Sequence, residues 1–166
     1  MKLFRTRIAV ALCALLLLST AALAEGPKKT LPGDLSLAQA QVILKAAQAK
    51  AEAIKVPMNI AVVDAGGNLK AFARMDDAFL GSIDISAKKA LTARSFNMST
   101  RALGAAAQPG QPLYGIEVTN GGLAIFAGGV LLVDKHNVVI GAVGVSGGSV
   151  DEDESVALAG AAAVAK

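Results

Sequence analysis

The segment from residue 58 to residue 75 constrains the fold most, because two strand-like stretches are joined there by a very short connection. Met58 to Val63 is an apolar, β-branched stretch, and Leu69 to Met75 resembles a second strand. The connection from Asp64 to Asn68 includes two glycines. A parallel crossover needs about a dozen residues or more. The spacing therefore predicts an antiparallel hairpin.

Three helices are predicted around this hairpin. Ser36 and Gln39 form a capping-box pattern, and apolar residues then recur every three or four positions until residue 54. Ser82 is the expected N-cap of a second helix. Ser149 and Glu152 form another capping box, which opens an alanine-rich helix that runs to about residue 164.

Three more strands are expected in the second half of the chain, at 123–126, 130–133 and 138–145, with a turn at 134–137. The strands come in hairpin groups between helices. This order favours an α/β chain of the α+β type, with an antiparallel sheet flanked by helices, over a doubly wound parallel sheet.

The first 24 residues have the pattern of a signal peptide. Residues 1–7 carry three basic side chains, Ile8 to Leu18 is an unbroken apolar stretch of 11 residues, and Ala22 to Ala24 is a small-x-small cleavage site. An apolar stretch that spans a bilayer needs about 20 residues, so a retained anchor is the less favoured alternative. We expect a lead-in at 25–35, one domain at 36–166, no stable membrane insertion after cleavage, and a periplasmic or secreted protein.

Cleavage would change both the charge and the thiol content. It would leave 13 of the 16 basic residues against 13 acidic ones, a net charge of zero, so no nucleic-acid partner is expected. It would also remove Cys13, the only cysteine. Disulfides, thiolate metal sites and a cysteine nucleophile are then excluded.

Three motifs suggest familiar chemistry but lack the groups that it needs. Gly144 to Gly148 matches the G-x-S-x-G elbow of serine hydrolases, yet no histidine follows Ser146. The only histidine, His136, lies in a predicted turn. The carboxylates at 151–154 would repel a phosphate; they favour a solvated helix start over a calcium site. We therefore predict no catalytic residue and no metal ligand.

Basic side chains beside the hairpin suggest instead a carboxylate-binding site. Arg74 ends the second strand, and Lys88 and Lys89 lie on the second helix. Together they could hold a small carboxylate by charge-assisted hydrogen bonds. The alternative is that Arg74 or Lys88 forms surface ion pairs with Asp76, Asp77 or Asp84, as is common.

Six short motifs, in order and covering nearly the whole chain after residue 35, resemble the GlcG/HbpS family of small haem-binding or haem-degrading proteins. The motifs are Ala61–Gly67, Arg74–Asp76, Gly81–Ile85, Lys89–Ala93, Gly128–Gly129 and Ile140–Gly148. The resemblance implies an antiparallel five-stranded sheet flanked by helices and a homo-oligomer. It also implies haem or a related tetrapyrrole as the small-molecule ligand.

We expect the ligand site to combine seven residues: Arg74, Asp76, Lys89, Thr92, Glu117, Gly128 and Gly129. Arg74 and Lys89 would hold ligand carboxylates, while Thr92 and the backbone amides of the glycine turn would add hydrogen bonds. The chain departs from the family at Val118, where many relatives carry a histidine, and at 126–131, where many have a proline-set turn.

Two other functions stay open. The protein could be an enzyme that acts on a small organic acid, as in glycolate-type metabolism. Arg74 would then bind the carboxylate, and Asp76 or Glu117 would act as a general base if burial raised its pKa. It could also be a sensory or structural partner of a membrane protein, without a ligand of its own.

Overall fold

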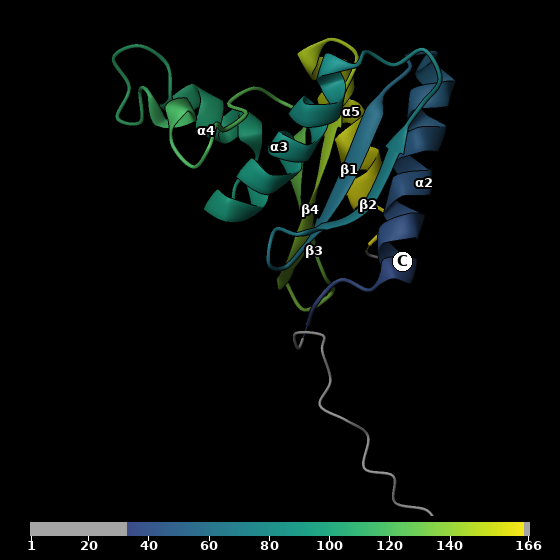
Figure 1. Ribbon diagram of the computed structural model, residues 1–166. Helices are drawn as coiled ribbons and strands as arrows, with labels where there is room; N and C mark the ends of the chain where they lie inside the picture. The colour runs from purple at the N-terminus through teal and green to yellow at the C-terminus, as the bar shows by residue number, and fades with distance from the viewer. Residues whose placement is uncertain (1–32, 165–166) are drawn as a thin grey trace, which may run out of the picture. The chain divides into compact units, whose positions relative to one another are not determined.

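The computed structural model describes residues 33–164 (Figure 1). The predicted signal peptide and most of the predicted lead-in lie outside these residues. The chain forms, in order, α2 (Leu37–Ile54), β1 (Asn59–Asp64), β2 (Leu69–Arg74), α3 (Gly81–Phe96), α4 (Thr100–Ala106), the 3-10 helix η1 (Ile116–Val118), β3 (Gly129–Val133), β4 (Val139–Ser146) and α5 (Val150–Ala161).

The four strands form one antiparallel sheet in the order β2-β1-β4-β3. The predicted hairpin is confirmed, with Asn59 of β1 opposite Arg74 of β2. The prediction of five strands is wrong, because 123–126 forms no strand. The backbone N–H of Ala124 instead donates to the Thr92 hydroxyl, 3.1 Å away. The apolar pattern of that stretch reflects burial against α3 and α4, not pairing with the sheet.

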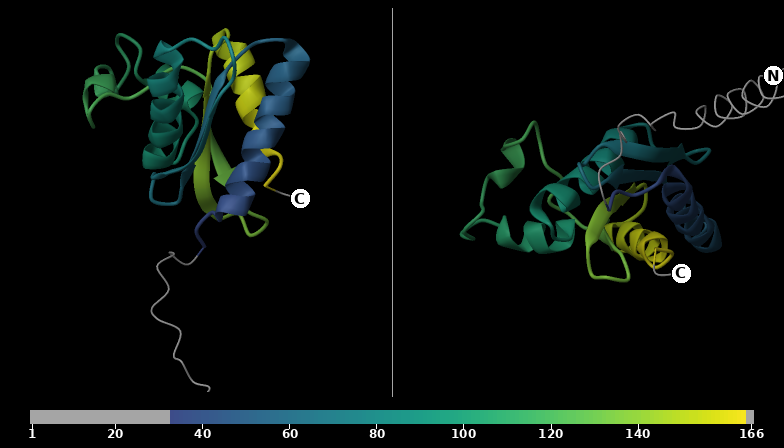
Figure 2. Two further views of the ribbon diagram at one scale, coloured as in Figure 1. Left: turned by 45° about the vertical axis from the view of Figure 1, so that its right-hand side comes forward. Right: turned by 90° about the horizontal axis from the view of Figure 1, so that it is seen from below.

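Helices cover both faces of the sheet, as Figure 2 shows from two sides. α2 and α5 pack together on one face, over a core of larger side chains that includes Ile60, Val62, Val143 and Val145. α3 packs on the other face, over β4, β1 and β3. The predicted α+β fold, an antiparallel sheet flanked by helices, is therefore confirmed.

The face under α3 is built from small residues. Its core consists of alanines and one valine: Ala61, Val63, Ala90, Ala93 and Ala142. Gly144 of β4 lies directly under the backbone of Ser86 and Ala90, where an added Cβ would clash. Small side chains let α3 approach the sheet closely, and this approach fixes the positions of the polar residues that α3 carries.

Both predicted capping boxes are confirmed: Ser36 with Gln39 starts α2, and Ser149 with Glu152 starts α5. The prediction that Ser82 caps α3 is wrong. The helix begins two residues earlier than a Ser82 cap would place it, with Leu80 at the N-cap and no side-chain cap, and Ser82 is buried. The backbone N–H of Ser82 donates to the carbonyl of Phe79, which takes the role of the cap.

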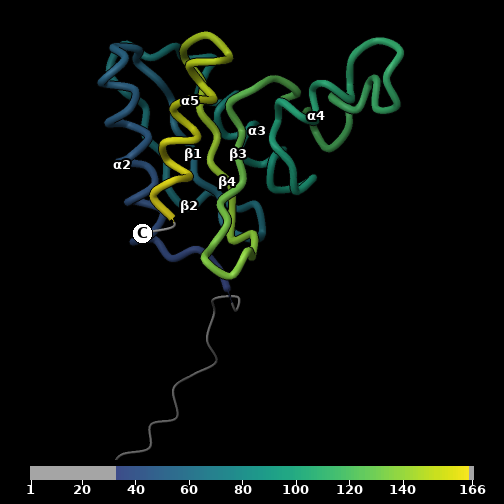
Figure 3. Tube along the Cα trace, turned by 180° about the vertical axis from the view of Figure 1, so that it is seen from behind, coloured from purple at the N-terminus to yellow at the C-terminus, as the bar shows by residue number. Residues whose placement is uncertain are grey.

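Residues 107–122 project from the rest of the described chain; we call this segment the arm (Figures 1 and 3). It includes η1, and a ladder of turn hydrogen bonds orders its backbone. The N–H of Leu113 donates to the carbonyl of Ala106, and the N–H of Leu123 donates to that of Glu117. Leu113, Tyr114 and Val118 are nevertheless exposed. Among residues 33–164, no helix is long and apolar enough to cross a bilayer.

Candidate functional site

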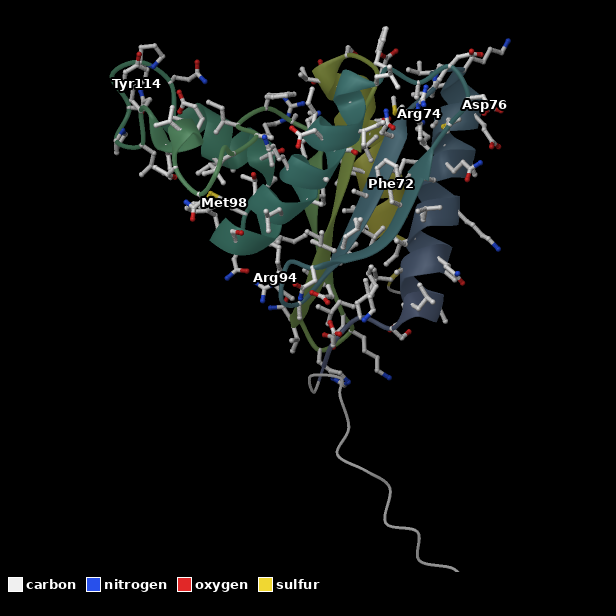
Figure 4. All side chains as sticks on the ribbon, viewed as in Figure 1. Phe72, Arg74, Asp76, Arg94, Met98 and Tyr114 are labelled. Atoms are coloured by element: carbon white, nitrogen blue, oxygen red, sulfur yellow. The ribbon has the colours of Figure 1, made fainter. Side chains whose placement is uncertain are left out.

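The seven residues of the predicted site lie in three separate places. Four of them, Lys89, Thr92, Gly128 and Gly129, are buried between α3 and the start of β3. Arg74 and Asp76 are exposed at the end of β2, and Glu117 is on the arm. In Figure 4, Asp76 and Tyr114, three residues before Glu117, lie on opposite sides of the molecule. One chain therefore does not bring the seven residues into a single pocket.

The buried group is organised by an ion pair. The ammonium group of Lys89 is fully buried and lies 2.6 Å from the carboxylate of Asp153 on α5. It also donates to the carbonyl of Val145, 3.0 Å away, and lies 4.5 Å from the centre of the Phe126 ring. Asp153 accepts a hydrogen bond from the N–H of Gly148. The pair thus ties α3, the end of β4, the start of α5 and the 126–128 turn together.

Burial opposes the ionised forms of this pair. Desolvation lowers the pKa of Lys89 and raises the pKa of Asp153, although their mutual hydrogen bond acts in the opposite direction on each. Charges this deeply buried depend on each other, because removal of one partner leaves the other without compensation. Lys89 is engaged inside the protein, so in one chain its ammonium group does not face an external ligand. Its expected role toward ligand carboxylates stays a prediction.

The threonine and the two glycines hold the same region together. The Thr92 hydroxyl accepts from the N–H of Ala124, and the Thr100 hydroxyl accepts from the N–H of Gly129. Gly128 has φ +121°, and a Cβ there would meet the ammonium group of Lys89 at 2.8 Å. The amide of Gly129 is thus already used within the chain. Three of the six family motifs meet at this one buried cluster.

A different, exposed surface remains where α3 leaves β2 uncovered; we call Leu69, Phe72, Ile83 and Leu91 the β2–α3 surface. Phe72 pairs with Ala61 and Leu69 pairs with Val63, so both lie on the α3 side of the sheet. They are 37% and 59% exposed.

The other half of this surface comes from the flank of α3 that faces β2. The Leu91 side chain reaches the β1–β2 turn, where a Cβ on Gly67 would lie 3.0 Å from it. Ile83 lies about two helical turns before Leu91 and about 80° around the helix from it. An apolar sheet edge and an apolar helix flank therefore meet side by side.

Two arginines lie beside the β2–α3 surface. Arg74 lies two residues from Phe72, on the same face of β2, and Nε donates to the carbonyl of Ala78 at 3.3 Å. Arg94 lies in the last turn of α3, and its Nε is buried without a hydrogen-bond partner. Figure 4 shows Phe72 between the two. Neither arginine forms an ion pair with another residue in the range 33–164.

The motifs that lacked catalytic partners lie in structural surroundings, and the expectation that the carboxylates at 151–154 are solvated is wrong for Asp153, which is buried. Ser146 is buried at the end of β4, where no substrate reaches it, and His136 is exposed in the β3–β4 turn. The carboxylates at the start of α5 are all engaged: Asp151 and Glu154 pair with Arg101, Glu152 caps the helix, and Asp153 pairs with Lys89. Within residues 33–164, no cluster of side chains suitable for a metal ion is found.

The residues of the β2–α3 surface suit one part of a haem group. A porphyrin offers a flat apolar ring and carboxylate side chains, which match the apolar side chains and Arg74. Haem iron is held by histidine, cysteine, methionine or tyrosine, and none of the four residues that define this surface is one of these. Of such side chains in the described chain, Met98, Tyr114 and His136 are exposed.

The fold and these surfaces define a small α+β domain, and comparison with known proteins gives its family. A family model described as "Haem degrading protein HbpS-like" matches residues 35–162. The chain therefore belongs to the HbpS-like family, and the resemblance seen in the sequence is confirmed.

Two relatives and one solved structure illustrate the likeness. An uncharacterized 15.0 kDa protein from the dhaT-dhaS intergenic region of Citrobacter freundii is 46% identical over 74% of this chain and 87% of its own length. The corrinoid adenosyltransferase PduO of the same organism is 37% identical over 79% of this chain, which spans only 39% of PduO. A crystal structure of a PduOC:heme complex superposes with a TM-score of 0.74 at 35% identity, over 80% of this chain and 99% of that one.

Proposed function

We propose that this protein is an exported, oligomeric small-molecule-binding protein whose leading ligand is haem or a related tetrapyrrole. Family membership and the haem complex of a similar structure support the ligand class. The signal-peptide pattern of residues 1–24 supports export. The observation that carries the proposal is the β2–α3 surface, which exposes large apolar side chains beside an unpaired arginine.

The physical argument for this surface rests on area and charge. Exposed patches of large apolar side chains usually mark a binding site, and each Å² of apolar surface removed from water contributes about 25 cal/mol. A planar ring that covers Phe72 and Leu91 would gain this contribution. Arg74 would then lie at the ring's edge, where its guanidinium could bind a carboxylate. Because position 118 is valine, this mode of binding would not use the histidine that many relatives carry there.

Titration of the purified protein with hemin tests the proposal. We expect saturable binding with a shift of the Soret band. Arg74→Gln should weaken it about tenfold, because a hydrogen bond to a charged group contributes about 1.5–3 kcal/mol. Lys135→Gln, which removes a cation from the exposed β3–β4 turn, is the matched control and should bind as the wild type does. Unsaturable binding, or equal effects of the two substitutions, would contradict the proposed ligand or its place.

A further inference from the structure

A turn near the end of the arm carries an asparagine that is followed by a glycine. Asn120 and Gly121 are both exposed, and they form the only asparagine–glycine step in the chain. The N–H of Gly122 donates to the carbonyl of Thr119 at 2.9 Å, and Asn120 and Gly121 have φ +53° and +73°, as in a type I′ turn. No hydrogen bond among the described residues uses the N–H of Gly121. The nitrogen of Gly121 is therefore open to reaction.

Two other asparagines share this backbone conformation but not the open nitrogen. Asn97 and Asn137 are exposed and have φ +51° and +62°. The residues that follow them are a methionine and a valine. Their N–H groups donate to the carbonyl of Ala93 at 3.2 Å and to the carboxylate of Asp134 at 2.9 Å. The three sites therefore differ at the following residue, in its side chain and in whether its N–H is hydrogen-bonded.

Both differences favour deamidation at Asn120, and asparagine is a thermolabile residue. In this reaction, the backbone nitrogen of the next residue loses its proton to hydroxide and forms a bond to the carbonyl carbon of the asparagine side chain. The C–N bond of the side-chain amide breaks, and the nitrogen leaves as ammonia with a proton from water. Water then opens the cyclic imide at either carbonyl, which gives an aspartyl or an isoaspartyl residue. Glycine has no Cβ to hinder the attack, and a free N–H has no hydrogen bond to lose.

We infer that Asn120 is a modification site, at which the folded protein converts an asparagine to an aspartyl or isoaspartyl residue without an enzyme. Glu117 is the only charged residue of the arm, so the reaction gives the arm a second carboxylate. Lys88 of α3 lies beside this turn: a Cβ on Gly122 would lie 3.4 Å from its ammonium group, which pairs with Asp84 at 3.0 Å. The modification thus changes the charge where the arm meets α3. This inference does not depend on the proposed ligand.

Peptide mapping of the ligand-free protein by mass spectrometry tests the site. The tryptic peptide 102–135 contains Asn120 as its only asparagine, and both of its glutamines precede a proline, which has no N–H to attack. In mildly alkaline buffer, the acid form of this peptide should accumulate at least about tenfold faster than the acid forms at Asn97 and Asn137, a modest difference in activation free energy. Its rate should rise with hydroxide concentration. No acid form at Asn120, or equal rates at the three sites, would overturn the inference.

A second asparagine–glycine step separates the effect of the fold from that of the sequence. Val138→Gly places such a step in the β3–β4 turn, where the carboxylate of Asp134 holds the N–H of residue 138. In the folded variant, deamidation at Asn137 should stay several-fold slower than at Asn120. In urea the two rates should become similar, because unfolding releases that N–H. Equal rates in the folded variant, checked by circular dichroism, would overturn the role given to the free N–H.

The matched substitution at the site itself is Gly121→Ala. Nothing lies within 4 Å of the Cβ that it adds, so the change acts mainly on the attacking nitrogen and its neighbourhood. It should slow deamidation at Asn120 and leave the rate at Asn137 unchanged. An unchanged rate at Asn120 would show that the acid form arises by another route and would contradict the inference.

Discussion

At the scale of single residues, the buried Lys89–Asp153 pair is the most constrained feature of the molecule. The pair lies under Gly128 and Phe126 and joins segments that are 64 residues apart in the chain. Its burial explains why a lysine in a family motif need not contact a ligand. The ammonium group donates to Asp153 and to the Val145 carbonyl, and the Phe126 ring lies 4.5 Å from it.

Loss of the carboxylate should therefore destabilise the protein strongly. Asp153→Asn leaves a buried ammonium group without a counter-charge, which costs about 3–5 kcal/mol in comparable pairs. Asp151→Asn removes an exposed partner of Arg101 and should cost less than about 1 kcal/mol. Urea unfolding of both variants measures the difference. Similar midpoints for the two would show that the buried pair contributes little.

At the scale of elements, predictions from sequence succeeded where local chemistry decides and failed where distant contacts do. The hairpin and both capping boxes depend on residues within a few positions of each other. The 123–126 stretch has the apolar pattern of a strand, but the hydrogen bond from the Ala124 N–H to the Thr92 hydroxyl and packing on α4 hold it outside the sheet. Ser82 looks like a cap but faces the sheet. Nothing local in the sequence joins Lys89 to Asp153 or Phe72 to Leu91.

The capping box of α5 leads to a prediction about acid. Hydrogen bonds from the backbone N–H and hydroxyl of Ser149 lower the pKa of Glu152 below its usual value of 4.5. A carboxylate with a lowered folded-state pKa stabilises the fold above its unfolded pKa, and this stabilisation is lost as the pH falls through the folded value. The half of the box that uses the Glu152 carboxylate therefore contributes at neutral pH and is lost in acid.

Ser149→Ala should lower the free energy of unfolding by about 1 kcal/mol at neutral pH. The loss should shrink in strong acid, as the pH falls through the lowered pKa of Glu152 and its bonds with Ser149 weaken. It should not vanish, because the bond from the N–H of Glu152 to the Ser149 hydroxyl does not depend on that carboxylate. Glu52→Gln, at an exposed carboxylate in the last turn of α2, serves as a control outside any capping box. Urea unfolding at both pH values gives the comparison. A loss for Ser149→Ala that is the same at both would contradict the assignment.

At the scale of the whole molecule, the two faces of the sheet are packed differently. α2 and α5 cover one face with a core of larger side chains, whereas α3 lies close over small residues and leaves β2 open. The open strand supplies the β2–α3 surface, and the arm leaves from the other flank of α3. The fold thus presents its two apolar surfaces in different directions, an arrangement that suits contact with another copy and not closure on itself.

If each ligand site is shared between two chains of the expected homo-oligomer, ligand binding and assembly must be coupled. A ligand that contacts two chains binds the assembly more tightly than the monomer, so it must promote assembly by the same factor. We expect hemin to raise the fraction of assembled wild type near the concentration at which half is monomeric, as measured by sedimentation. Equal hemin affinity in monomer and assembly would place the ligand within one chain.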